Sequence, residues 1–327
     1  MWREGCAQFA AEVGSDHLGS SFARVPGTAG GPALAIVGHI DEIGLHVSHI
    51  DDHGFLCFGG VGGWDPVVLI GQRVRVGTRE GPVPGVIGRK PIHLLEDEDR
   101  KKTPKLKDLR LDIGADSAQE ARKLVRIGDV AVIDVMPIEL RGGLLVSRAL
   151  DNRVGCYVAA QAARLVAGAG GAPGDVLALA VVQEETTFAG SRTSAYARRP
   201  ELAIVVDLTF ATDQPGIELG QITEHKLGSG PVLARGTTLH PLLFDGLCEA
   251  GEQERIPFTV ESLGKGTGTD ADAIHVSRSG IPTGLVSVPC RYMHSPVEMV
   301  SLQDIDAAAR LIAAFAARVA PGMSFTR

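Results

Sequence analysis

Four continuous apolar runs, separated by stretches with helical periodicity, constrain the fold of this 327-residue chain most strongly. Runs of this kind are typical of strands in a sheet that is covered on both faces. Helical patterns begin at residues 151, 240 and 301, and Ser301 is the expected N-cap of the last one. Strands that alternate with helices predict an α/β layer fold. The four runs are ALAIVGHID at 33–41, VLALAVVQE at 176–184, LAIVVDLTF at 202–210 and TGLVSVP at 283–289.

The stretch at 45–138 has a different pattern, with short alternating runs and many Gly or Pro turns. Apart from SAQEARKLV at 117–125 it has almost no helical periodicity. It predicts a small β-rich domain inserted into an α/β domain formed by 1–44 and 139–327. The charged run at 96–110 is interpreted as a solvated loop. Three histidines in this stretch are interpreted as strand and turn residues, namely His46, His49 and His53.

The composition excludes several classes of protein. The net charge of -7 leaves no basic face for a nucleic-acid partner. No apolar stretch approaches the roughly eighteen residues that a membrane span needs, so no membrane partner is expected. The five cysteines are odd in number and never form a C-x-x-C pair, which is typical of reduced thiols. A cytoplasmic location follows by default.

Acidic or imidazole side chains stand near the ends of the apolar runs and at the start of the helical pattern at 151. The adjacent Glu184 and Glu185 are notable, because a strand alternates its faces and burying two unpaired carboxylates is costly. The carboxyl ends of strands in an open α/β sheet line the ligand crevice, so these side chains should converge there and repel unless cations hold them. Carboxylates and imidazoles without thiolate suit Zn²⁺, Co²⁺ or Mn²⁺ at a hydrolytic site. The candidates are His39, Asp41, Asp151, Glu184, Glu185, Asp207 and His294.

Six ordered motifs carry a family resemblance: GHIDEIGLHV, ALDNRVG, VVQEE, VVDLTFATDQP, GTDADAI and RYMHSPVEMV. In order and spacing they resemble the tetrahedral or deblocking aminopeptidases, two-metal peptidases that are also described as glucanase-like aminopeptidases. The resemblance implies a zinc-peptidase-like α/β fold with a mixed central sheet and helices on both faces. It also implies that the inserted domain, 45–138, is a β-barrel-like dimerisation domain. Dimers of this kind would build a homo-oligomer, up to a tetrahedral dodecamer.

The resemblance also implies roles for the candidate residues. His39 and Asp207 would bind one metal ion, Glu185 and His294 would bind the other, and Asp151 would bridge both. Glu184 would be the general base, and Asp41 would orient His39. The spacing agrees with the last role, because residues two apart lie on the same face of a strand. The peptide bond after the bridging Asp151 is expected to be cis.

The predicted function is therefore a metal-dependent aminopeptidase that removes N-terminal residues from peptides with a two-metal-activated water and a glutamate base. Zinc is the first choice of metal, with cobalt and manganese as alternatives. Two other functions stay open: a two-metal amidase acting on a small acylated or carbohydrate-linked substrate, and a catalytically silent scaffold. A scaffold would have no chemical need for Glu184.

Two segments near the candidate residues require separate interpretation. After the paired glutamates the family usually has a Val-Gly-Leu-Arg-Gly type of turn, whereas this chain has TTFAG at 186–190. This difference leaves the preferred side chain of the substrate open. The segment GTGTDADA at 266–273 lacks the Lys-Ser/Thr of a phosphate loop and no strand is predicted before it. It is interpreted as part of the rim of the substrate pocket.

Overall fold

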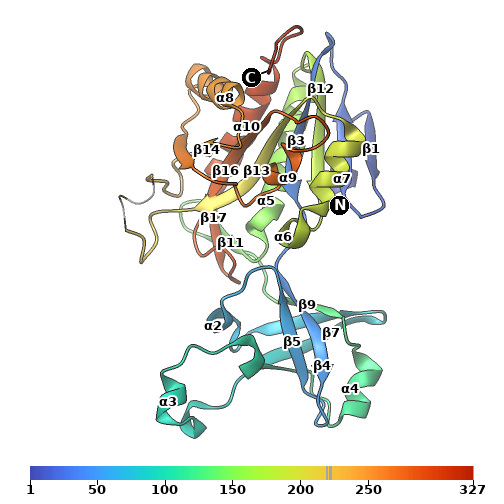
Figure 1. Ribbon diagram of the computed structural model, residues 1–327, viewed down its shortest axis with the longest axis vertical. Coiled ribbons are helices and arrows are strands. Elements are labelled where there is room, and N and C mark those ends of the chain that lie inside the picture. The colour runs from blue at the N-terminus through green and yellow to red at the C-terminus, as the bar shows by residue number, and fades with distance from the viewer. Residues whose placement is uncertain (219, 221–222, 327) are drawn as a thin grey trace. The chain divides into compact units, whose positions relative to one another are not determined.

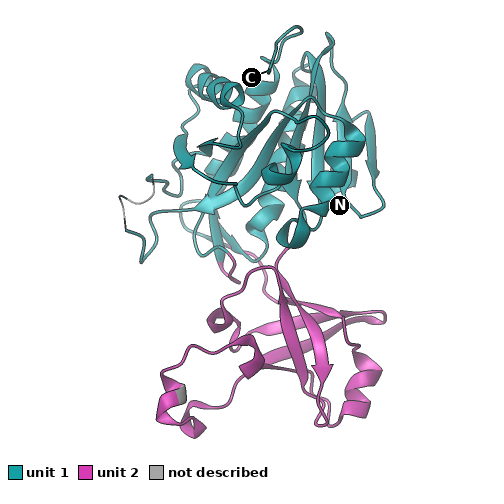
Figure 2. Cartoon of the chain, in the orientation of Figure 1, with its two compact units in different colours: residues 1–41, 139–293, 298–327 teal, residues 42–138, 294–297 magenta. Residues whose placement is uncertain are grey.

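The computed structural model describes residues 1–218, 220 and 223–326 (Figure 1). The chain forms two compact units (Figure 2). The first, in teal, contains residues 1–41, 139–293 and 298–327. The second, in magenta, contains residues 42–138 and 294–297.

An eight-stranded mixed sheet forms the centre of the first unit. Its middle strands β12, β3, β13 and β16 run parallel to one another, whereas β2 and β14 pair antiparallel with the strands on either side. In spatial order the strands are β1 (Glu12–Ser15), β2 (Ser21–Val25), β12 (Gly174–Val181), β3 (Gly31–His39), β13 (Leu202–Phe210), β16 (Thr283–Cys290), β14 (Val232–Gly236) and β15 (Thr259–Leu263).

Helices cover both faces of this sheet, because the side chains of each middle strand alternate between two apolar cores. Ile36 and Ile204 pack in one core with α5 (Leu150–Gly168), α8 (Pro241–Glu254) and α10 (Leu302–Ala316). Val37 and Val205 pack in the other core with α7 (Ala189–Arg198) and α9 (Ala271–Ile274). The predicted fold class, a mixed central sheet with helices on both faces, is confirmed.

Most predicted elements are present, with shifted ends. The strand at 202–210 matches β13, whereas the run at 176–184 leaves the sheet at Val181. The hydroxyl of Ser301 accepts a hydrogen bond from the Gln303 amide, as expected of an N-cap. The sequence did not predict the outer strands β1, β2, β14 and β15, because they are short and only partly apolar. β15 ends at Leu263, so the expectation that no strand precedes 266–273 is wrong.

The remaining helices and strands of the first unit are short. It includes α1 (Trp2–Cys6), α6 (Glu184–Thr187) and a three-stranded sheet of β10 (Ile138–Leu140), β11 (Leu144–Ser147) and β17 (Glu298–Ser301). Among the residues that the structure describes, no helix is long and apolar enough to cross a membrane.

The second unit is a small closed β-barrel. Around the barrel its strands are β4 (Gly44–Ile50), β5 (Leu56–Val61), β8 (Arg110–Asp112), β7 (Gly81–Gly88), β6 (Arg73–Thr78) and β9 (Val130–Ile133). Their pairs are antiparallel, and alternate side chains such as Leu45, Val76 and Leu111 fill the interior. His46 and His49 lie on β4, and His53 lies in the turn that follows.

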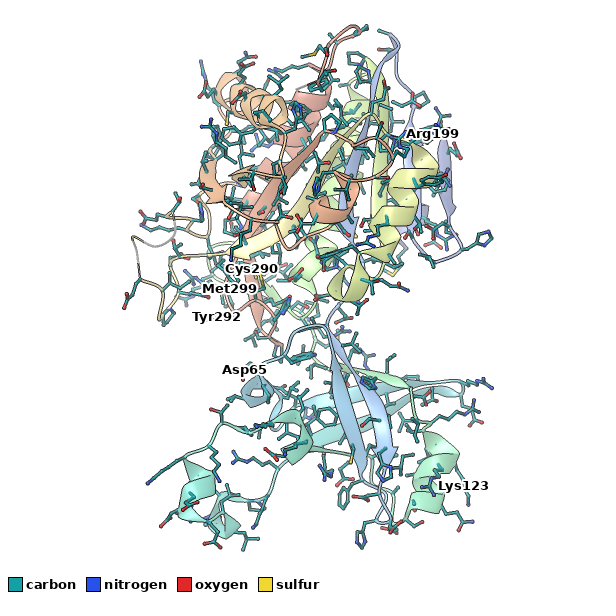
Figure 3. The ribbon with its side chains drawn as sticks, in the orientation of Figure 1. Asp65, Lys123, Arg199, Cys290, Tyr292 and Met299 are labelled. Atoms are coloured by element: carbon teal, nitrogen blue, oxygen red, sulfur yellow. The ribbon has the colours of Figure 1, made fainter. Side chains whose placement is uncertain are left out.

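Short helices connect the barrel strands. The predicted helix at 117–125 is α4 (Ala118–Leu124), which begins at the cap Ser117. Figure 3 labels Lys123 on this helix and Asp65, which caps α2 (Pro66–Leu69) by accepting from the Val67 amide at 2.9 Å. The expected loop at 96–110 is only partly irregular, because it contains α3 (Asp97–Arg100) and the 3₁₀ turn η2 (Leu106–Asp108). A second 3₁₀ turn, η1, spans Ile92–Leu94.

Candidate metal centre

Two neighbouring parallel strands bring the first candidates together. Val37 of β3 pairs with Val205 of β13, and His39 and Asp207 each follow two residues later. Residues two apart on a strand share a face, so both side chains project on the side of the sheet that α7 and α9 cover. His39 is 1% and Asp207 5% exposed. The sheet itself thus places an imidazole and a carboxylate side by side in a buried region.

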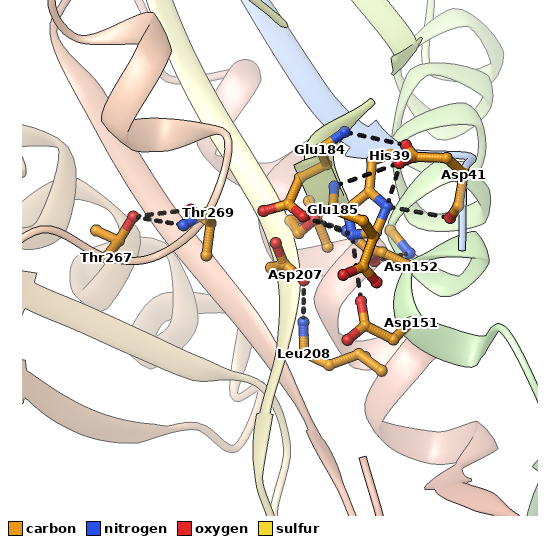
Figure 4. A network of polar contacts seen from close by, with 12 residues as sticks. His39, Asp41, Asp151, Asn152, Glu184, Glu185, Asp207, Leu208, Thr267 and Thr269 are labelled. Atoms are coloured by element: carbon orange, nitrogen blue, oxygen red, sulfur yellow. Dashed lines mark hydrogen bonds and ion pairs between the residues drawn. The ribbon is translucent and has the colours of Figure 1, made fainter. Parts of the chain in front are cut away.

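The imidazole of His39 is held at both ring nitrogens (Figure 4). Its Nδ1 lies 3.2 Å from the carbonyl oxygen of Asp41 and 3.6 Å from Oδ1 of the same residue. Its Nε2 lies 3.2 Å from Asp151 Oδ1 and 3.8 Å from Glu184 Oε2. Burial by itself would lower the pKa of His39, but the hydrogen bonds to Asp151 and Asp41 outweigh burial and raise it well above the usual value. Nε2 therefore faces the group of carboxylates while Asp41 fixes the other nitrogen.

The paired glutamates do not alternate along a strand. The chain leaves β12 at Val181, Gln183 adopts a left-handed conformation with φ 62°, and Glu184 and Glu185 then open the helical turn α6. Side chains on such a turn can point into the same region, which a strand would prevent. Glu184 is 8% exposed, and burial, followed by the charges of neighbouring carboxylates, raises its pKa to about 8 although His39 lowers it.

Asp41 holds this turn as well as the imidazole. Its Oδ1 accepts a hydrogen bond from the Glu184 amide at 3.2 Å, and its Oδ2 accepts one from the Glu185 amide at 3.3 Å. These amides belong to the first turn of α6, where backbone N–H groups have no partner inside the helix. One carboxylate thus positions His39 and the backbone of both glutamates.

Asp151 approaches the same region from the N-terminal end of α5. Its amide donates to Glu298 Oε2 at 3.1 Å, and the Asp151-Asn152 peptide bond is cis, as predicted. Burial, followed by the nearby charge of Asp151, raises the pKa of Asp207 well above its usual value. The two carboxylates are therefore close enough to oppose each other's ionisation.

Asn152, the only asparagine of the chain, fixes the start of α5 on the sheet. Its Nδ2 donates to the carbonyl oxygen of Val206 at 2.8 Å, and its Oδ1 accepts from the Gly155 amide at 2.8 Å. Asn152 is completely buried, and both ends of its amide are satisfied. Because Val206 precedes Asp207, this side chain ties the two segments that carry Asp151 and Asp207.

The donor atoms fit divalent cations. His39, Asp151 and Asp207 each offer one atom within 4.8 Å of the others, and so do His39, Glu184 and Glu185. Buried carboxylates at this spacing need positive charge to ionise together, and the oxygen and imidazole donors suit Zn²⁺, Co²⁺ or Mn²⁺. The six predicted residues of the first unit are thus brought together: His39, Asp41, Asp151, Glu184, Glu185 and Asp207.

His294 belongs to the second compact unit. Its backbone is left-handed, with φ 58°, and its Nδ1 lies 3.0 Å from the carbonyl oxygen of Gly63. Its role as a metal ligand stays a prediction.

Sequence reasoning missed three polar residues around this centre: Asn152, Asp270 and Glu298. Asn152 follows the predicted bridging aspartate, and Glu298 ends the stretch RYMHSPVE, so both lie inside motifs that carry the family resemblance. Asp270 lies in GTDADAI, but it is 1% exposed and so does not form part of a pocket rim. The expectation for that residue of the segment 266–273 is wrong, because the loop turns its side chain inward.

Comparison with known proteins identifies the family. Residues 19–311 match the model of the M42 glutamyl aminopeptidase family. A lysyl aminopeptidase from Pyrococcus furiosus is 36% identical over 96% of this chain and 89% of its own length.

Solved structures agree with this match. A TET aminopeptidase from a marine sediment thaumarchaeon has a TM-score of 0.91 and 34% identity, covering 97% of this chain and 89% of its own. The TET1 peptidase of Pyrococcus horikoshii can assemble into a tetrahedron or a large octahedral shell. Its structure has a TM-score of 0.83 and 32% identity, and the match covers 96% of this chain and 91% of that chain. With its buried imidazole and carboxylates and a family match over most of its length, the chain belongs to the M42 glutamyl aminopeptidase family of peptide hydrolases.

Proposed function

We propose that this protein removes N-terminal residues from peptides with the help of two divalent cations and a glutamate general base. The observation that carries the proposal is the convergence of one imidazole from β3 with the carboxylates of four residues from three other segments of the first unit. These are Asp151, Glu184, Glu185 and Asp207 around His39. Membership of a metal-dependent aminopeptidase family supports it.

The proposed ligands follow the family resemblance. His39 and Asp207 would hold one cation, Glu185 and His294 would hold the other, and Asp151 would serve as a ligand to both. The grouping of His39, Asp151 and Asp207 within 4.8 Å supports the first position. For the second position, the side chain of Glu185 and the imidazole of His294 offer the oxygen and nitrogen donors that zinc prefers. Zinc is the proposed metal, with cobalt or manganese as alternatives.

Glu184 is the proposed base. When bound, two cations would polarise the scissile carbonyl group and lower the pKa of the attacking water. Glu184 accepts the proton of that water and then transfers it to the leaving amine. Its burial and its raised pKa of about 8 support a carboxylate that takes up a proton near neutral pH. Asp41 keeps the imidazole of His39 and the turn of Glu184 in place.

Metal removal tests this function. We expect a chelator to reduce the hydrolysis of aminoacyl-p-nitroanilides to background, and added Zn²⁺, Co²⁺ or Mn²⁺ to restore it, because the proposed chemistry depends on bound cations. N-acetylated forms of the same substrates are the control and should not be cleaved. Cleavage of the acetylated compounds would favour the amidase, and the absence of hydrolysis with every metal would favour the scaffold. Full activity in metal-free protein would contradict the proposal.

We also propose that the inserted domain of the second unit, residues 45–138, mediates assembly into a dimer-based homo-oligomer. The tetrahedral and octahedral shells of the related TET1 peptidase support this proposal. Light scattering should give a mass of two or more chains at micromolar concentration, with a tetrahedral dodecamer as the largest expected species. Exposed apolar residues of this unit, such as Ile92, offer sites where a charged substitution should reduce the mass. A monomeric wild-type protein would refute the proposal.

A further inference from the structure

Asp270, the residue before α9, is a buried carboxylate that lacks a hydrogen bond. It is 1% exposed, and neither of its oxygens has a hydrogen-bond partner among the residues that the structure describes. By geometry the hydroxyl of Ser191 donates its proton to the carbonyl oxygen of Phe188 at 2.9 Å, although it also lies close enough to Asp270 to lower its pKa as a weak hydrogen-bond partner. Most buried polar groups in proteins are hydrogen-bonded, so this carboxylate requires an explanation.

The preceding loop does not depend on Asp270 for its own hydrogen bonds. Asp272 accepts from the amides of Thr267 at 2.8 Å and Gly268 at 2.9 Å. The hydroxyl of Thr269 lies 2.9 Å from that of Thr267 (Figure 4). It also accepts a hydrogen bond from the Ala271 amide at 3.2 Å. Asp272 and the two threonines thus make hydrogen bonds that close this loop. The side chain of Asp270 therefore has no structural role in closing this loop.

Asp270 is buried near groups of the metal centre. α9 packs with α7 on the face of the sheet from which His39 and Asp207 project. Burial raises the pKa of Asp270 to about 6, against the opposing effect of His39, and the charge of Asp270 in turn raises the pKa of Glu184. Asp270 therefore interacts electrostatically with groups of the centre.

We propose that Asp270 is a supporting residue of the metal centre, whose buried negative charge strengthens cation binding at His39 and Asp207 without contacting the cation. An unpaired buried carboxylate destabilises a folded protein unless positive charge compensates it. A divalent cation held nearby provides that compensation, because Coulomb interactions are only weakly screened in a buried region. The inference rests on the proposed function, since it requires that the centre bind cations.

The neutral variant Asp270→Asn has almost the same shape and separates charge from structure. Without metal it should melt at a higher temperature than the wild-type protein, because an uncompensated buried charge has been removed. Its affinity for Zn²⁺, measured by competition with a chromogenic chelator, should fall by about tenfold or more. A purely structural role predicts the opposite change in melting temperature and no change in affinity.

Asp272→Asn is the matched control in the same loop. It weakens the hydrogen bonds to Thr267 and Gly268, so it should lower the melting temperature with and without metal and leave the affinity for Zn²⁺ unchanged. Asp270→Ala provides a second neutral variant and should show the same loss of affinity as Asp270→Asn.

The outcomes are distinct. Unchanged affinity in Asp270→Asn, or a lower melting temperature of its metal-free form, would overturn the inference and leave the proposed function intact. The same holds if neither neutral variant folds, because the carboxylate would then be structural. If the wild-type protein binds no cation, the proposed function fails, and the inference fails with it.

Discussion

Replacing Glu184 with glutamine should lower kcat by about 10²–10⁴-fold, the usual contribution of a general base, while the protein keeps its metal. The amide has nearly the shape of the carboxylate but cannot accept the proton of the attacking water. Turnover of an aminoacyl-p-nitroanilide, measured together with metal content by mass spectrometry, tests this expectation. Since the proposed role of Glu184 lies in the chemical step, KM should change much less than kcat.

The neighbouring residue provides the control. Glu185→Gln makes the same chemical change one position further along the turn, but it removes a proposed metal ligand. It should reduce metal content, and its activity should partly recover when excess metal is added. Full activity of Glu184→Gln with its metal in place would show that another group is the base. Loss of metal in both variants would show that Glu184 is itself a ligand.

Replacing Asp151 with asparagine should weaken metal binding by more than about 100-fold. Loss of a residue that only supports a ligand weakens metal binding by up to about 100-fold, and loss of a ligand itself should have a larger effect. The Oδ1 atom of Asp151 lies 3.2 Å from Nε2 of His39, and Asp151 also interacts with Asp207. Removing its charge should therefore affect both of these proposed ligands. Activity should fall with metal content and return only at high metal concentration. Calorimetric titration with Zn²⁺ provides the measurement.

Asp306→Asn is a suitable control for that substitution. Asp306 makes an exposed ion pair with Arg310 on α10, so the same loss of charge there should change neither metal binding nor activity. Tight metal binding by Asp151→Asn would exclude the bridging role.

The centre of the fold was predictable because its strands are buried on both faces. A doubly covered strand must be apolar at nearly every position, as in the run at 202–210, which matches β13. The outer strands were not predicted from the sequence because they are short and less completely buried. β15, for example, has only partly buried and exposed residues, and such segments have no distinctive pattern.

The candidate residues were predictable because charge at the end of an apolar strand is costly without a function. Glu184 and Glu185 illustrate this, and the left-handed residue Gln183 shows how the chain turns to direct them. The supporting contacts were not predictable from one sequence. The hydrogen bonds from both glutamate amides to Asp41, and the burial of Asp270, depend on segments that are distant in the sequence and meet only in the folded chain.

The contacts of Asp41 have a consequence for how the protein takes up its cations. The same carboxylate steadies the imidazole proposed for one position and the backbone of the glutamate proposed for the other. If the centre holds two cations as proposed, both positions would depend on this one carboxylate. Any strengthening that one cation gave the other through Asp41 would then be reciprocal. A substitution at Asp41 would therefore weaken both positions together.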